Sequence, residues 1–101
     1  MARSSTPPCR KLTAAESERL HKPRMRKVQS RALSALGYDG RTRRLFVNFQ
    51  GEEPTYVYLA VPAAAWRELR EAGSRGAFVN TAVKPGRECW QLSERLRASS
   101  T

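Results

Sequence analysis

The sequence predicts an α+β domain: a three-stranded antiparallel β-meander covered on one face by one longer and one or two short helices, with a flexible basic N-terminal arm. Three observations predict this class. Residues 44–50 and 55–60 have the composition and alternation of strands and are separated by a turn containing Gly and Pro. Residues 62–72 carry apolar side chains at spacings of three and four, as in an amphipathic helix. The N-terminal third is basic and has no hydrophobic period.

Positive charge is concentrated in this arm. The 101 residues carry 19 Lys and Arg against 9 Asp and Glu, a formal net charge of +10. Residues 1–31 hold nine of these bases and two acids, a net of +7, and residues 32–101 hold ten bases and seven acids, a net of +3. The asymmetry predicts a polyanion partner, either nucleic acid or an anionic membrane surface. The alternative is that the charge only keeps a small protein soluble.

The sequence does not have the features of a secreted, membrane-spanning, disulfide-rich or metal-binding protein. The first twenty residues are polar, and no stretch approaches the roughly 20 apolar residues that span a membrane. Cys9 and Cys89 are 80 positions apart and form neither a disulfide framework nor a metal-ligand pattern. His21, the single histidine, lies beside Lys22 and Pro23 with no adjacent carboxylate or cysteine to make a site, and is expected to be solvated. We therefore expect a cytoplasmic protein without a metal or other cofactor.

The arm, residues 1–27, is expected to be largely disordered. Residues 1–12 contain the run SSTPP and have no hydrophobic period. Thr13 with Glu16 three positions later matches a capping box, so a short helix is expected there that is marginal in isolation and ends before the following proline.

The ordered domain is expected to span residues 28–86. A turn at Asp39–Gly40 precedes the strand in which Leu45, Val47 and Phe49 alternate with polar or exposed positions, and GEEP then turns the chain into the strand TYVYLA.

Proline at position 62 is predicted to open the longer helix, whose apolar stripe includes Trp66 and Leu69. Ser74 is predicted to cap a second short helix that ends at Lys84–Pro85–Gly86. Residues 87–101 form a C-terminal extension, either a last short helix or an extended strap.

Together, the segments LGYDGRTRRLFVNF, YVYLAVP and AGSRGAFVNTAVK resemble the KTSC domain. This family is named after a segment at the C-terminus of some lysyl-tRNA synthetases and also occurs as small stand-alone bacterial and phage proteins. The most specific matching residues, within roughly residues 30–84, are Tyr56, Tyr58, Val61, Pro62, Ser74, Arg75, Gly76, Phe78 and Asn80. The resemblance implies a compact α+β domain. The family has no established function, but its synthetase context suggests RNA binding.

The two tyrosines can be placed in two ways. On a strand, Tyr56 and Tyr58 face one side of the sheet and Val57 faces the other. We favour the arrangement in which the tyrosines share a face with Leu45 and the other apolar residues of its strand, under the helix. Phe46 and Val57 are then the stacking candidates on an open face; in the other arrangement the tyrosines themselves would form that platform.

The sequence thus favours a small non-enzymatic nucleic-acid-binding module, with RNA as the favoured ligand, because it contains no paired carboxylates, no nucleophile with a base and no phosphate loop. No small-molecule substrate and no membrane insertion are expected. The alternative is a protein-interaction module, a small regulator that docks on a larger partner and whose arm folds on binding. The candidate nucleic-acid-binding residues are Lys22, Arg24, Arg26 and Lys27 in the arm, Arg41, Arg43 and Arg44 at the first hairpin, Phe46 on the open face, and Arg75 at a helix N-terminus.

Overall fold

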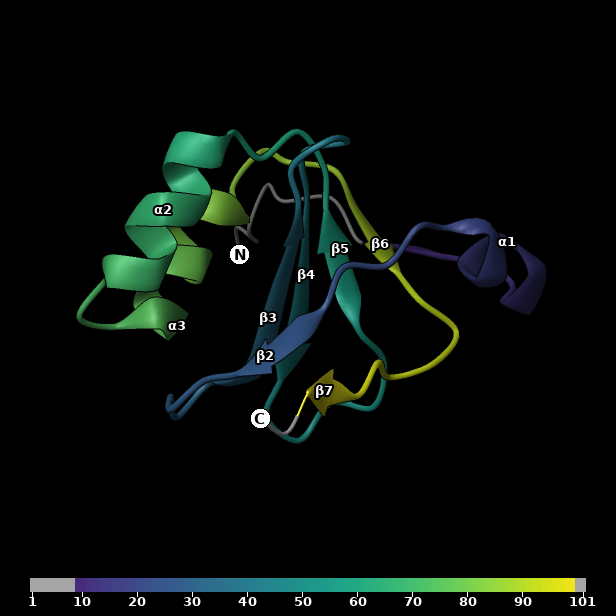
Figure 1. Ribbon diagram of the computed structural model, residues 1–101, viewed down its shortest axis with the longest axis horizontal. Helices are drawn as coiled ribbons and strands as arrows, with labels where there is room; N and C mark the ends of the chain where they lie inside the picture. The colour runs from purple at the N-terminus through teal and green to yellow at the C-terminus, as the bar shows by residue number, and fades with distance from the viewer. Residues whose placement is uncertain (1–8, 100–101) are drawn as a thin grey trace, which may run out of the picture.

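The computed structural model describes residues 9–99 and confirms the α+β class (Figure 1). Helices α2 and α3 lie on one side of a mixed sheet and α1 lies toward the other side. The strands are β1 (Arg10–Lys11), β2 (Met25–Lys27), β3 (Leu33–Asp39), β4 (Arg44–Phe49), β5 (Tyr56–Tyr58), β6 (Cys89–Gln91) and β7 (Ala98–Ser99). The helices are α1 (Ala14–Arg19), α2 (Ala63–Glu71) and α3 (Arg75–Phe78), which continues into a π-helical segment, Val79–Val83.

The sheet has seven strands in the order β1-β6-β5-β4-β3-β2-β7. The predicted meander, β3-β4-β5, lies at its centre, and β2 and β6 extend it on both sides by antiparallel pairing. The outermost strands pair in parallel, β1 with β6 and β7 with β2. The prediction of three strands was therefore too low, because the four additional strands have only two or three residues each and show no alternation.

The register of β5 settles the position of the two tyrosines. Tyr58 is opposite Leu45 and Tyr56 is opposite Val47, so both tyrosines share the face that α2 and α3 cover. Tyr58 is buried, and Tyr56 is partly buried against the same core. The favoured placement of these rings in the core is confirmed.

The core under the helices, which we call the first-face core, is apolar. Its buried members are Leu33, Leu36, Leu45, Val47, Tyr58, Val61, Leu69, Val79, Val83 and Cys89. Trp66, which the helical stripe placed in the core, is only partly buried: its ring stacks on Tyr38 with centroids 5.4 Å apart and planes 13° apart. The Tyr38 hydroxyl in turn donates to the carbonyl of Val61 at 2.5 Å, which fixes the start of α2 against the sheet.

The opposite face of the sheet, the second face, is also covered. Its buried residues are Leu12, Met25, Ala35, Phe46, Val57 and Leu92, and they form a second core. Phe46 and Val57 are both 0% exposed. The prediction of an open face carrying Phe46 as a stacking residue is therefore wrong, because the chain on either side of the central domain folds over it.

The N-terminal part of this cover, which we call the arm (residues 9–27), is ordered. The predicted capping box is present, with Glu16 N donating to Thr13 Oγ1 at 3.1 Å and Thr13 N donating to Glu16 Oε1 at 2.9 Å. The arm then returns along β3 as β2. The expectation of a largely disordered arm is wrong for residues 9–27, and residues 1–8 lie outside the described residues.

The C-terminal part of the cover, which we call the tail (residues 87–99), is an extended strap rather than a helix. It is anchored by the buried pair Asn48 and Thr55, whose side chains hydrogen-bond to each other. Asn48 Nδ2 donates to the carbonyl of Leu96 at 2.8 Å, and Leu96 N donates to Thr55 Oγ1 at 2.8 Å. The backbone of the strap thus satisfies polar groups that the sheet would otherwise bury unpaired.

Arm and tail are also joined to each other. Cys9 and Cys89, which the sequence analysis left unpaired, form a disulfide. Leu12 N donates to the carbonyl of Gln91 at 2.9 Å, and Ser93 N donates to the buried hydroxyl of Ser17 at 2.9 Å. Among residues 9–99, the helices are all too short and too polar to cross a bilayer.

Candidate nucleic-acid interface

Most of the predicted basic residues lie on one part of the sheet. Residues 19–51, which contain β2, β3 and β4, hold nine Lys and Arg and a single carboxylate, Asp39. Strand β2 pairs with β3 within the sheet and lies nearer the viewer than β3 in Figure 1. We call the following residues the basic edge: Lys22, Arg24, Arg26, Lys27, Arg31, Arg41, Arg43 and Arg44.

The pairing of β2 with β3 brings the basic residues of the arm to the first hairpin. Arg26 is opposite Leu36 and the chain runs antiparallel, so Arg24 lies near the end of β3 that leads into the turn. Gly37 permits this approach, because a Cβ at that position would lie 3.0 Å from the carbonyl oxygen of Arg24. Two groups of cations that are far apart in the sequence thus meet at one end of the sheet.

His21 and Asp39 hold this arrangement. His21 Nδ1 lies 3.2 Å from Asp39 Oδ2, although the histidine side chain is 71% exposed. The expectation that His21 has no carboxylate partner is wrong, because the partner is distant in sequence. Burial alone would raise the pKa of Asp39, but hydrogen bonds from Arg41 N, the side chain of Thr42 and His21 outweigh it and hold the pKa below its usual value. The one carboxylate of the segment is therefore ionised, buried and already engaged.

The cations of the basic edge have no acidic partners. Within the described part of the chain, Arg10 is the one Lys or Arg side chain that forms an ion pair, with Glu16 at 2.7 Å. Arg24, Arg26, Lys27, Arg31, Arg41 and Arg43 are exposed, and Lys22 and Arg44 are partly buried. The positive charge of this edge is thus available to an anionic ligand.

Two grooves adjoin the end of the sheet away from the first hairpin. The first has a volume of about 700 Å³ and lies between residues 29–32 and the start of α3; its charged lining residues are Arg31 and Arg75. The second has a volume of about 500 Å³ and lies between β2 and the tail; its charged lining residues are Lys27, Arg95 and Arg97. Neither lining includes a carboxylate. Arg95 and Arg97 were not among the predicted residues, because only the strap places them beside β2.

The Ser74–Arg75–Gly76 run has mainly structural contacts. Ser74 Oγ caps α3 by accepting from Ala77 N at 3.2 Å, so that N–H group is already used. Gly76 packs on the chain before β3, and a Cβ there would lie 2.8 Å from Ala32 Cβ. The Arg75 guanidinium donates to the carbonyl of Arg70 at 2.9 Å. Arg75 therefore lines the first groove as a cation, and α3 supplies no separate phosphate site.

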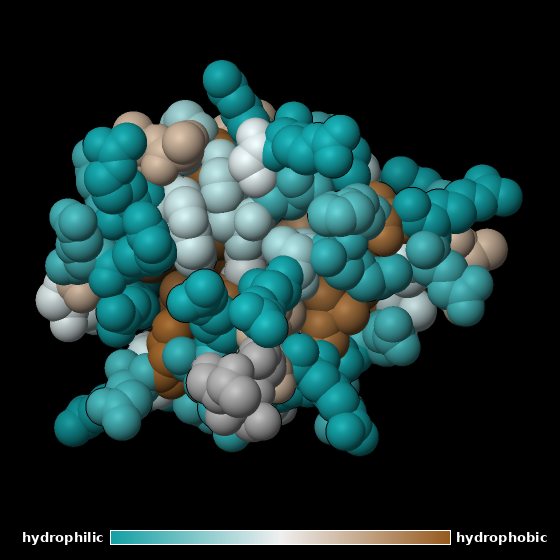
Figure 2. Space-filling model, in the orientation of Figure 1, coloured by the Kyte–Doolittle hydropathy of each residue, from teal (hydrophilic) through white to brown (hydrophobic). Residues whose placement is uncertain are grey.

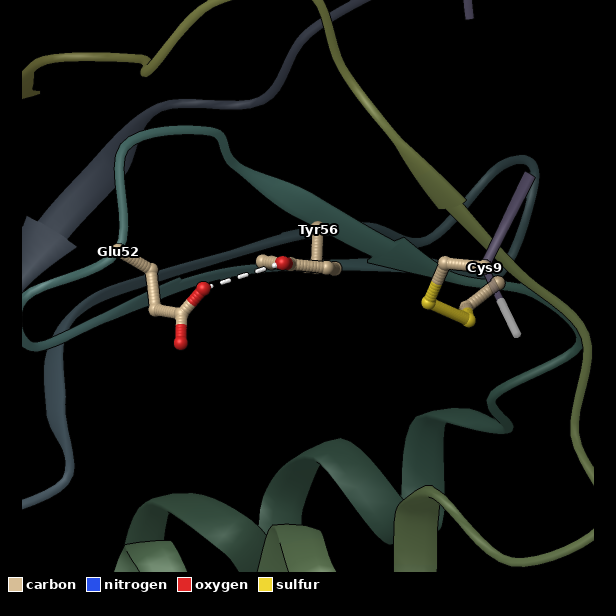
Figure 3. The surroundings of a disulfide bond; sticks show 4 residues. Cys9, Glu52 and Tyr56 are labelled. Carbon is tan, nitrogen blue, oxygen red and sulfur yellow. Dashed lines mark hydrogen bonds between the residues drawn. A yellow bond between two sulfur atoms is a disulfide. The ribbon is translucent and has the colours of Figure 1, made fainter. Parts of the chain in front are cut away.

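The tyrosine pair belongs to the core rather than to the interface. Figure 3 shows Tyr56 between Glu52 and the disulfide, with α2 and α3 facing it. Burial and the hydrogen bond to Glu52 Oε1, at 3.1 Å, raise the pKa of Tyr56. Burial raises the pKa of Tyr58 far above its usual value. Both hydroxyls are therefore protonated near neutral pH. No group of three or more potential ligand side chains within residues 9–99 is arranged to hold a metal ion.

Comparison with known proteins identifies the central domain. The family model of the KTSC domain matches residues 29–86. A protein of Tsukamurella paurometabola is 43% identical over 61 residues, which are 60% of this chain and 90% of that protein. The crystal structure of a KTSC domain protein from Yersinia pestis superposes with a TM-score of 0.64 at 31% identity, covering 67% of this chain and 94% of that one. Both relatives are matched almost completely, whereas the arm and the tail lie outside the family match.

Proposed function

This chain belongs to the KTSC domain family, and we propose that it is a nucleic-acid-binding member that contacts phosphates through its basic edge, with RNA as the favoured ligand. The proposal involves no catalytic step. The observation that supports it best is the composition of residues 19–51, which contain nine Lys and Arg and a single carboxylate. That carboxylate, Asp39, is buried and hydrogen-bonded. The sheet fixes the backbone of the cations on β2 and β4, so binding of a nucleic-acid chain costs little backbone conformational entropy there.

The grooves extend this surface. The first groove lies wholly within the residues that match the family model, and the second combines Lys27 with tail residues outside that match. The two grooves adjoin along the chain, because Lys27 and Val28 line the second groove and the next four residues, 29–32, line the first. A nucleic-acid backbone that follows β2 would therefore meet further cations at the end of that strand. Such contacts position a ligand without reading its sequence.

A membrane surface is the less favoured polyanion. Peripheral binding to a bilayer combines cations with an exposed apolar face that inserts. The face of the molecule in Figure 2 is mostly hydrophilic, with small separate apolar areas. The apolar residues of the arm and tail instead pack on the second face of the sheet.

The cytoplasm, where nucleic acids are present, remains the proposed compartment. The Cys9–Cys89 disulfide is unusual for that compartment, because cytosolic thiols are kept reduced. Binding should therefore be measured on both the oxidised and the reduced protein.

The proposal is tested by fluorescence anisotropy of a labelled single-stranded RNA over a salt series. Log affinity should fall linearly with log salt, with a slope of about −0.7 per phosphate neutralised. Replacing Arg26 and Lys27 by Gln should weaken binding and reduce the magnitude of the slope by about 1.4, the contribution of two contacts. The matched control replaces Lys11 and Arg67 by Gln, which also removes one Lys and one Arg from exposed positions but lies away from the basic edge.

Two results would contradict the proposal. Absence of binding at low salt would exclude the nucleic-acid function, since counterion release favours binding most under that condition. A protein-interaction module, which docks on a larger partner, would then be the better hypothesis. Equal losses in the two double variants would show that net charge alone, and not the basic edge, causes the binding.

A further inference from the structure

Arg44 and Trp90 form a cation–π pair on the second face of the sheet. Trp90 is opposite Val57, and Val57 is opposite Phe46, so these three side chains project to the same face. Arg44 precedes Phe46 by two positions on β4 and therefore also projects there. Its guanidinium carbon lies 4.8 Å from the centre of the Trp90 ring.

This pair is where an aromatic ring of the second face reaches solvent. Phe46 is fully buried beneath the arm and the tail, whereas Trp90 is partly buried at the margin of the same core, near Leu59. Arg44 is likewise partly exposed. A guanidinium lying over an indole ring thus remains partly accessible, whereas the predicted platform of Phe46 is closed.

The charges around the pair point to a ligand with phosphates. Arg44 directly follows the exposed turn that carries Arg41 and Arg43, and Arg43 takes a left-handed backbone conformation there, with φ of 58°. No carboxylate pairs with Arg44 among the residues that the structure describes. Its contact with the indole is a cation–π interaction, and among residues 9–99 no carboxylate competes with a ligand for this guanidinium.

We infer that an unpaired base of a single-stranded nucleic acid stacks on the Arg44–Trp90 pair while the turn arginines contact the adjoining phosphates. The inference rests on the proposed function and specifies its ligand as a single strand rather than a duplex. Bases stack on aromatic rings and on guanidinium planes, and such stacking tolerates any sequence because every base has a π-face. In a duplex the bases are already stacked on each other and cannot reach the pair.

Trp90 fluorescence provides a direct test. In a Trp66→Phe background, which keeps an aromatic ring against Tyr38, Trp90 is the only tryptophan. This protein is titrated at low salt with a single-stranded RNA, the corresponding duplex and inorganic polyphosphate, and binding is followed in parallel by anisotropy or by competition. All three ligands should bind, but only the single strand should strongly quench Trp90.

A conservative substitution separates stacking from charge. Arg44→Lys keeps the positive charge and removes the planar guanidinium, so affinity for the single strand should fall by about 5- to 100-fold, the range for loss of one stacked base. Affinity for polyphosphate and the salt slope should be unchanged. Arg67→Lys, at an exposed arginine of α2 away from the basic edge, is the matched control and should leave the affinity for both ligands nearly unchanged.

The outcomes distinguish the two proposals. If no polyanion binds at low salt, the proposed function fails and the stacking site fails with it. If the single strand binds but quenches Trp90 no more than polyphosphate does, or if Arg44→Lys behaves like Arg67→Lys, the stacking site is overturned and phosphate binding stands.

Discussion

The two faces of the sheet are buried to the same extent, but different parts of the chain cover them. The buried residues of the first-face core lie within the KTSC match, apart from Cys89, and α2 and α3 cover them. The second face is covered by residues outside that match, including Leu12, Met25 and Leu92. Phe46 and Val57 on the second face are nevertheless as fully buried as Leu45 and Val47 on the first. The additions to the family domain are therefore part of the folded core.

The faces also differ in how their covers are held. Packing of Leu69, Val79 and Val83 holds the helices on the first face. On the second face, polar contacts from Asn48, Thr55 and Ser17 fix an extended arm and tail that have few apolar residues of their own. Each such hydrogen bond contributes about 1 kcal/mol net, but loss of one buried partner costs about 1–3 kcal/mol. The arm and tail are thus held in one position on the second face by these hydrogen bonds, and not by apolar packing alone.

Among the changes that test this comparison, removal of the disulfide should lower the stability most. Cys9 packs beside the first-face core and Leu12 lies in the second, on either side of the edge strand β1, so the disulfide fixes the start of the arm to β6. Replacing both cysteines by Ser opens a loop with a sequence separation of 80 and should lower the free energy of unfolding by about 4–5 kcal/mol on the chain-entropy model. Urea denaturation measures the change. Identical midpoints for oxidised and reduced wild-type protein would contradict this role.

Phe46→Ala should cost about 3–5 kcal/mol, because it leaves a large cavity in the second core. An open second face would instead make the substitution nearly neutral for stability. Chemical denaturation decides between the two, and a loss below about 1 kcal/mol would show that arm and tail cover the ring only loosely.

Two valines offer a matched comparison of the faces. Val47 on the first face and Val57 on the second are both 0% exposed. Substitution of each by Ala should cost about 1.5–3 kcal/mol, with similar values for the pair. If Val57→Ala costs much less than Val47→Ala, the second face can collapse around the missing methyl groups and is the softer of the two.

The smallest effect concerns the contact of the arm with the first hairpin. The pKa of Asp39 is lower in the folded protein than its usual value, so the folded state binds fewer protons than the unfolded state as the solution is acidified. The stabilisation is present above about pH 4 and is lost as the pH falls through the folded pKa. Asp39→Asn should therefore flatten the acid decline in stability. His21→Ala should flatten it only in part, because Arg41 N and Thr42 still donate to the carboxylate.

The difference between the faces also explains what could be predicted from the sequence. The strands β4 and β5, the helix α2 and the placement of Tyr58 follow from alternation, from helical spacing and from Pro62 at the N-terminus of the helix. The second cover has no comparable pattern, since Leu12, Met25 and Leu92 are isolated apolar residues in polar surroundings and the added strands are very short.

The same limit applies to the candidate site. Charge alone identified the cations of the arm and hairpin, but their meeting depends on the β2–β3 register and on the His21–Asp39 contact, which joins residues 18 positions apart. Arg44 lies on β4 and Trp90 lies on β6, which are far apart in the sequence although only β5 separates them in the sheet. No spacing rule connects such residues. Phe46 was misplaced because the burial of an alternate strand position depends on what covers that face.

Hydrogen exchange of the oxidised full chain tests most directly whether arm and tail form a second core. The amides of Leu12, Ser93 and Leu96 donate to acceptors in other segments and should be protected to a degree comparable with Val47 in the central strand β4. Free exchange at these three amides, together with strong protection of Val47, would contradict the account, because the second face would then be open in solution.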